Sequence, residues 1–115
     1  MVKDWQDVVD TANSRLMELR KAIPEVAKGF GGLAKAATSS GELDGKTKEL
    51  IALGISVSIR CDTCVAFHVR AAIKQGATRQ EMADAIGMAV YMGGGPSLMY
   101  GADALAAVDQ FMDAG

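Results

Sequence analysis

The sequence predicts an all-α protein, because its composition and the spacing of its apolar residues are both typical of helices. Half of the 115 residues are hydrophobic but only 5% are aromatic, and the apolar residues are mostly Ala, Leu, Ile, Val and Met. Small and straight-chain apolar residues favour helices, whereas aromatic and β-branched residues favour strands. Apolar residues also recur at steps of three and four, the period of an amphipathic helix. We expect one domain over residues 1–115, built as a single bundle of about six helices.

Two helices are predicted in the N-terminal third of the chain. The apolar stripe of the first comprises Trp5, Val8, Val9, Ala12, Leu16 and Leu19. Pro24 ends this stripe, and proline also suits the first turn of a following helix. The stripe of the second helix comprises Val26, Phe30, Leu33, Ala36 and Ala37. Three glycines between residues 29 and 32 weaken this second helix, and residues 38–41 are expected to form a loop.

The third and fourth helices are predicted on either side of a short break near Cys61. The third covers Asp44–Arg60, with its first residue as the N-cap. The segment ISVSI at 55–59 alternates like a strand, but the strongly helical KTKELIAL before it favours a helix throughout. The fourth covers Thr63–Gln75, with Asp62 as its N-cap and Gly76 as the left-handed residue after its C-terminus.

Two further helices are predicted in the C-terminal third. Thr78 and Glu81 have the spacing of a capping box, which predicts the start of a fifth helix that extends to about Met92. The segment GGGP at 93–96 breaks the chain, and a sixth helix rich in Ala and Gly is expected over 97–113.

Composition excludes several classes of function. The net charge is −2 with both signs mixed along the chain, so the basic patch of a nucleic-acid-binding protein is missing. No apolar run approaches the roughly 18 residues of a membrane span. The N-terminus is charged and unlike a signal peptide, and two cysteines without such a signal indicate the cytoplasm. A mean hydropathy of +0.14 is high for so small a chain, which favours a homo-oligomer with apolar interfaces.

The segment CDTCVAFH carries the chemistry. Cys61, Cys64 and His68 occupy positions i, i+3 and i+7, so they share one face of a helix. At the start of that helix, free backbone N–H groups and the helix dipole favour a thiolate. His68 lies one turn beyond Cys64 and is placed to accept its proton. The two-residue spacer also allows the sulfurs to form a disulfide, so we expect dithiol–disulfide chemistry with no cofactor and no metal.

Two alternative interpretations compete with redox chemistry, namely a zinc site and a purely structural role. A zinc site needs four ligands, and here Glu49 is the only evident addition to two Cys and one His. A closed site usually takes a second Cys/His pair, which the sequence lacks. Alternatively the thiols are inert and buried, and His68 merely packs.

The run from Glu49 to Thr78, followed by EMADAIGMAVYMGGGP, resembles the carboxymuconolactone decarboxylase and alkylhydroperoxidase D (AhpD-like) superfamily. The resemblance covers roughly residues 43–100. In the redox branch the motif is a Glu, a Cys twelve residues later that opens a CxxC, and a His four residues after the second Cys. Glu49, Cys61, Cys64 and His68 match all four positions.

This resemblance implies an all-helical fold, a trimeric or hexameric assembly, and an enzyme that reduces peroxides or disulfides. It also implies that Glu49 and His68 form a proton relay that activates Cys64, and that Cys61 resolves the oxidised sulfur as a disulfide. An external dithiol or protein electron donor then restores the thiols. The superfamily also contains a lactone decarboxylase, but that branch works without a CxxC pair, so the cysteines argue against it here.

The position of Glu49 and the role of the tyrosines stay open from the sequence. Along one helix, Glu49 lies about 18 Å from Cys61. If the next helix folds back antiparallel, His68 still lies about one helical turn away from the level of Glu49. The charged run around it suits a solvent-exposed Glu equally well. Tyr91 and Tyr100 are candidates for lining the entrance to the thiols or for burial with a satisfied hydroxyl.

Overall fold

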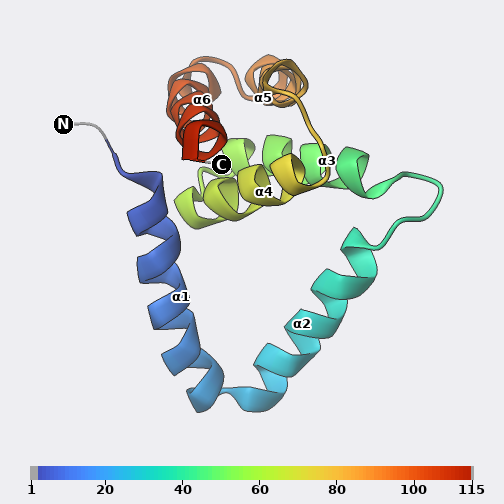
Figure 1. Ribbon diagram of the computed structural model, residues 1–115, viewed down its shortest axis with the longest axis vertical. Coiled ribbons are helices and arrows are strands. Elements are labelled where there is room, and N and C mark those ends of the chain that lie inside the picture. The colour runs from blue at the N-terminus through green and yellow to red at the C-terminus, as the bar shows by residue number, and fades with distance from the viewer. Residues whose placement is uncertain (1–2, 115) are drawn as a thin grey trace.

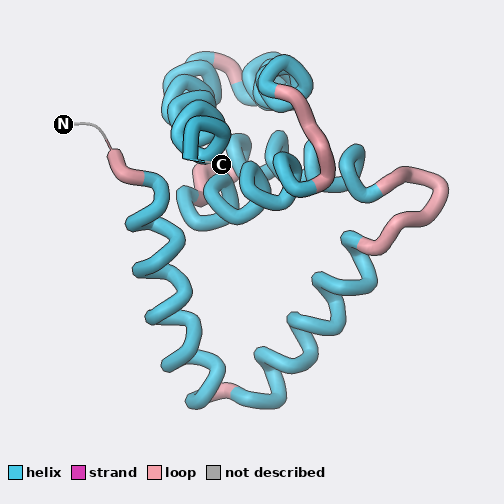
Figure 2. The backbone as a smooth tube through the Cα atoms, viewed as in Figure 1, coloured by secondary structure: helices cyan, strands magenta, loops and turns pink. Residues whose placement is uncertain are grey.

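The structure is a computed structural model that describes residues 3–114, and these residues form six helices and no strand (Figure 2). The helices are α1 (Trp5–Ala22), α2 (Pro24–Thr38), α3 (Gly45–Ser58), α4 (Asp62–Lys74), α5 (Arg79–Gly93) and α6 (Gly95–Ala114). The predicted all-α fold class is therefore confirmed, and the strand-like alternation at 55–59 belongs to a helix and the turn that follows it.

Helices α3 to α6 pack together as a body, and α1 and α2 form a V that leaves it (Figure 1). The first turns of α1 are anchored in this body, since Trp5 and Val9 are each only 1% exposed. The rest of the core comes from the other helices and includes Leu53, Val57, Val65, Val69, Met82 and Val108. In contrast, α2 contains no buried residue.

The turn between α3 and α4 differs from the prediction and places the first cysteine. Arg60 adopts a left-handed conformation with φ of 53°, so α3 ends at Ser58 rather than at Arg60. The Arg60 N–H donates to the Val57 carbonyl, and the Cys61 N–H donates to the Ser56 carbonyl. This is the Schellman pattern that closes a helix. Because it leaves Cys61 extended, with φ of −105° and ψ of 103°, Cys61 is the N-cap of α4 and the prediction of Asp62 for that role is wrong.

The other predicted boundaries are close to the observed ones. Gly76 has a φ of 87° and follows α4 as expected, and the Thr78 capping box opens α5. The predicted break over 93–96 is too long, because Gly94 alone, with a φ of 72°, separates α5 from α6. Pro96 lies in the first turn of α6. The N–H groups of a first turn make no hydrogen bond within the helix, so the N–H that proline lacks is not needed there.

No helix within residues 3–114 is both long enough and apolar enough to cross a membrane.

Candidate active site

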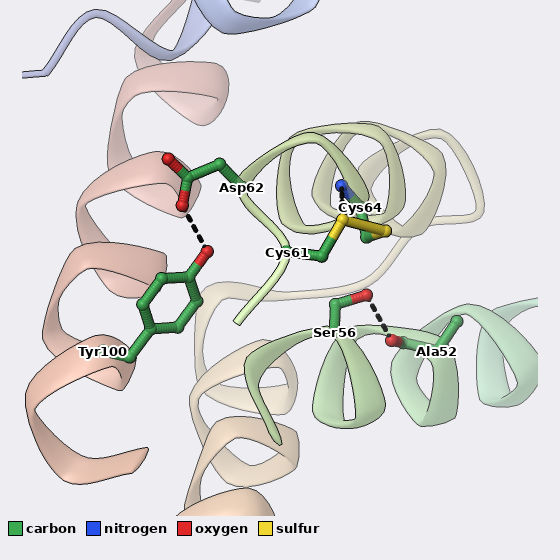
Figure 3. The surroundings of a disulfide bond; sticks show 6 residues. All are labelled: Ala52, Ser56, Cys61, Asp62, Cys64 and Tyr100. Atoms are coloured by element: carbon green, nitrogen blue, oxygen red, sulfur yellow. Dashed lines mark hydrogen bonds between the residues drawn. A yellow bond between two sulfur atoms is a disulfide. The ribbon is translucent and has the colours of Figure 1, made fainter. Parts of the chain in front are cut away.

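The two cysteines form a disulfide at the start of α4 (Figure 3). Their Cα atoms are 5.2 Å apart, and both residues are half-buried. The Cys64 backbone N–H donates to Cys61 Sγ at 3.1 Å, so the sulfur occupies the place of an N-cap oxygen. Such a hydrogen bond and the positive end of the helix dipole both favour an anionic sulfur once the disulfide is reduced.

His68 and Glu49 contact each other directly across α3 and α4. The Nδ1 atom of His68 lies 3.1 Å from Oε1 and 3.4 Å from Oε2 of Glu49. The Glu49 side chain is 8% exposed and that of His68 is 32% exposed, so the interpretation of Glu49 as a solvent-exposed residue is wrong. The two side chains therefore meet directly across the gap that helix lengths alone predict.

The carboxylate determines which face of the imidazole is available for chemistry. When the carboxylate is ionised it only accepts hydrogen bonds, and the Nδ1 atom of His68 then carries the proton that it donates to Glu49. The Nε2 atom is then the basic nitrogen. Because α4 also carries the cysteines, this base belongs to the same helical segment as the disulfide.

Asp62, between the two cysteines, bonds to residues far away in the sequence. The Tyr100 hydroxyl of α6 donates to Oδ1 of Asp62 at 2.5 Å (Figure 3), and Lys3 Nζ donates to Oδ2 at 2.7 Å. Partial burial opposes ionisation, but the bonds from Lys3 and Tyr100 outweigh it and hold the pKa of Asp62 below its usual value. Burial, followed by the bond to Asp62, raises the pKa of Tyr100.

Sequence reasoning missed this contact because 38 residues separate Asp62 from Tyr100 and no local pattern joins them. Of the two roles considered for the tyrosines, Tyr100 has a half-buried ring with a satisfied hydroxyl. Tyr91 is 79% exposed, so burial is excluded for it within this chain.

A groove of about 770 Å³ lies between α1 and the start of α4, and we call it the thiol groove. Its α4 side is formed by residues 61–64. Its other side comprises Lys3, Asp4, Asp7, Val8, Thr11, Ala12, Arg15 and Leu16. The disulfide therefore lies on an accessible surface that carries charges of both signs.

Residues 3–114 contain no group of three or more His, Cys, Asp or Glu side chains arranged to hold a metal ion.

Comparison with known proteins gives a consistent family. The model of the carboxymuconolactone decarboxylase family matches residues 24–107. An uncharacterized protein of Cupriavidus necator is 38% identical over 109 residues, which cover 95% of this chain and 96% of that one.

Solved structures of such proteins share the fold. A carboxymuconolactone decarboxylase family protein from Legionella pneumophila is 48% identical with a TM-score of 0.90, and the match covers 93% of this chain and 96% of that one. A family member from Thermotoga maritima, for which a part in the antioxidative response has been suggested, is 31% identical with a TM-score of 0.72. That match covers 76% of this chain and 91% of the Thermotoga chain.

Proposed function

We propose, since this chain belongs to the carboxymuconolactone decarboxylase family, that it is an AhpD-like thiol-dependent oxidoreductase that reduces peroxides or disulfides. The observation that carries the proposal is the Cys61–Cys64 disulfide on the same helix as His68, whose ring is held by the buried Glu49. The suggested antioxidative role of the Thermotoga relative, which is 31% identical, is consistent with this chemistry.

The first step oxidises Cys64. In the reduced protein, Nε2 of His68 takes the proton of the Cys64 thiol, and the thiolate attacks one oxygen of the peroxide. A sulfur–oxygen bond forms, the oxygen–oxygen bond breaks, and the alcohol leaves with the proton returned from His68. Cys64 is then a sulfenic acid. Glu49 acts as a positioning residue here, because it contacts only the ring and stabilises the imidazolium that forms.

The second step closes the disulfide and the third reopens it. The Cys61 thiol attacks the sulfenic sulfur of Cys64, so a sulfur–sulfur bond forms and water leaves. An external dithiol or protein electron donor then attacks the pair, is itself oxidised to a disulfide, and releases both thiols. With a disulfide substrate, the reduced Cys61–Cys64 pair attacks the substrate and is oxidised to the disulfide as two substrate thiols leave. The external dithiol then reduces the pair as before. We place the protein in the cytoplasm, where such reductants are abundant.

We also propose that the protein is a homo-oligomer, a trimer or hexamer, and the exposed face of α2 supports this. Val26, Phe30 and Leu33 lie at positions i, i+4 and i+7 and are 67%, 68% and 63% exposed. A short helix with an unpacked apolar face is not stable alone in water. A second copy of the chain offers a matching surface in the apolar groove of about 560 Å³ between α3 and α5.

A stopped-flow assay of peroxide consumption with a dithiol donor tests the proposed activity. We expect rapid consumption by the wild type and loss of activity in Cys64→Ser and in Cys61→Ser. Single-turnover oxidation separates their roles, since Cys61→Ser should still form one sulfenic acid per chain whereas Cys64→Ser should form none. Equal turnover by the wild type and Cys64→Ser would reject the mechanism. Ser40→Ala, at an exposed position outside the thiol groove, is the control and should keep the wild-type rate.

A further inference from the structure

The charged residue between the two cysteines is held from two sides. Asp62 accepts hydrogen bonds from Tyr100 of α6 and from Lys3 in the segment before α1 (Figure 3 shows the tyrosine bond). Asp62 is also the first residue of α4. Its carboxylate therefore shares the N-terminus of that helix with the sulfurs of its two sequence neighbours.

Lys3 is kept at this place by more than the ion pair. Its Nζ atom lies 4.8 Å from the centre of the Trp5 ring, and Trp5 is buried in the core. Gln110 of α6 clamps the same segment, because its side chain accepts from the Trp5 N–H at 2.9 Å and donates to the Lys3 carbonyl at 2.7 Å. The backbone at Lys3 is therefore tied to α6, and the ammonium group lines the thiol groove with 40% of its side chain exposed.

These charges act unequally on the two redox states of the cysteine pair. The disulfide is neutral, whereas the reduced pair contains a thiolate when it reacts. A carboxylate at the same helix start repels that thiolate and competes with it for the helix dipole, so it disfavours the reduced reactive form. The Lys3 ammonium group has the opposite effect. The lowered pKa of Asp62 means that it is ionised at neutral pH, so both charges are present.

We infer that the Lys3–Asp62–Tyr100 cluster sets the balance between the disulfide and the reactive thiolate, with Asp62 biasing the pair toward the disulfide and Lys3 offsetting that bias. Asp62 and Lys3 are positioning residues that act through the sulfurs and take no part in bond making. The inference rests on the proposed function, because the balance matters only if the pair cycles.

Other charged groups of the candidate site stay constant in the test. Asp4, Asp7 and Arg15 line the thiol groove from the segment before α1 and from α1 itself, and the Glu49–His68 pair lies between α3 and α4. Substitution of one member of the cluster leaves all of these in place. A change in thiol acidity therefore reports on the cluster.

The test is the pH dependence of alkylation of the fully reduced protein by iodoacetamide, with each cysteine followed by peptide mass spectrometry. For the more acidic thiol, we expect the acid dissociation constant to rise about threefold in Asp62→Asn and to fall about threefold in Lys3→Gln. The redox equilibrium with glutathione should change as well, when it is measured at a pH above the pKa of this thiol. We expect Asp62→Asn to shift it toward the dithiol and Lys3→Gln to shift it toward the disulfide.

The opposite signs distinguish charge from mere support. If the cluster only supports the backbone, both variants weaken the same 2.7 Å contact between residues 3 and 62, so both would change the acidity of the thiol in one direction. Shifts of equal sign, or no shift in either variant, overturn the inference. The control is Asp109→Asn, which removes an exposed carboxylate bonded to Arg79 and should change nothing.

The two proposals fail separately, because alkylation requires no turnover. A protein that shows the opposite shifts but reduces neither peroxides nor disulfides contradicts the proposed function alone. One that turns over its substrate but shows shifts of equal sign contradicts only the inference.

Discussion

The Nδ1 atom of His68 lies 3.1 Å from the Oε1 atom of Glu49, a contact that joins α4 to the second turn of α3. Glu49 is buried and has the imidazole as its one hydrogen-bonded side-chain partner among the described residues. A buried carboxylate is costly unless it is paired. The contact is therefore important both to the fold and to the orientation of the base.

The first prediction concerns this contact. Glu49→Gln keeps the shape of the side chain but removes the charge that stabilises the imidazolium, so we expect peroxide turnover to fall by about 10- to 100-fold. Peroxide turnover should fall at least as far in His68→Ala, because this substitution removes the base itself. Steady-state kinetics across a range of pH measures both variants. The control is Glu42→Gln, an exposed carboxylate outside the helices, and a wild-type rate in Glu49→Gln would exclude the relay.

The second prediction concerns the assembly. Phe30→Asp places a charge on the exposed apolar face of α2, and a charge cannot be buried in an apolar interface without a partner. We expect the molar mass in solution, measured by light scattering, to fall from that of an oligomer to that of a monomer. Lys28→Gln on the same helix should leave the mass unchanged. A wild-type protein that is monomeric at micromolar concentration would contradict the proposed assembly.

The third prediction follows from the lowered pKa of Asp62, whose ordinary value is 3.8. A group with a lowered folded pKa stabilises the folded state above its unfolded pKa, and this stabilisation disappears as the pH falls through the folded pKa. Asp62→Asn should therefore unfold at a lower urea concentration than the wild type at pH 7, with a difference that narrows below about pH 4. A difference that stays constant down to pH 2 would show that the bonds to Asp62 do not depend on its charge.

The fourth prediction concerns the turn before Cys61. Arg60 is in the left-handed region with φ of 53°, where a side chain is strained and glycine is not. Arg60→Gly should therefore raise the free energy of unfolding by about 0.5–1 kcal/mol. Urea titration measures it. Ser58→Gly, two residues earlier in the last turn of α3, should lower the stability by a similar amount, because its conformation is helical. Destabilisation in Arg60→Gly would mean that the arginine side chain makes a contact that outweighs the strain.

Most of the helix boundaries were predictable, because they depend on neighbours in the sequence. The capping box at Thr78 and the left-handed Gly76 are local patterns, and both are confirmed. The end of α3 was not predictable in this way. A left-handed arginine has no compositional signal, whereas a glycine at that position does. The misplaced N-cap at Asp62 is a consequence of that one residue.

In the candidate site, too, some features follow from local sequence patterns and others do not. By itself the sequence placed Cys64 and His68 one turn apart on the same helix, with Cys61 at the start of that helix, because the period of a helix is a property of the local backbone. Only the tertiary structure decided that Glu49 reaches His68 and that Tyr100 and Lys3 reach Asp62. These contacts depend on how α3, α6 and the N-terminal segment pack against α4. That packing is settled by the burial of side chains from all of these elements together, which no local spacing encodes.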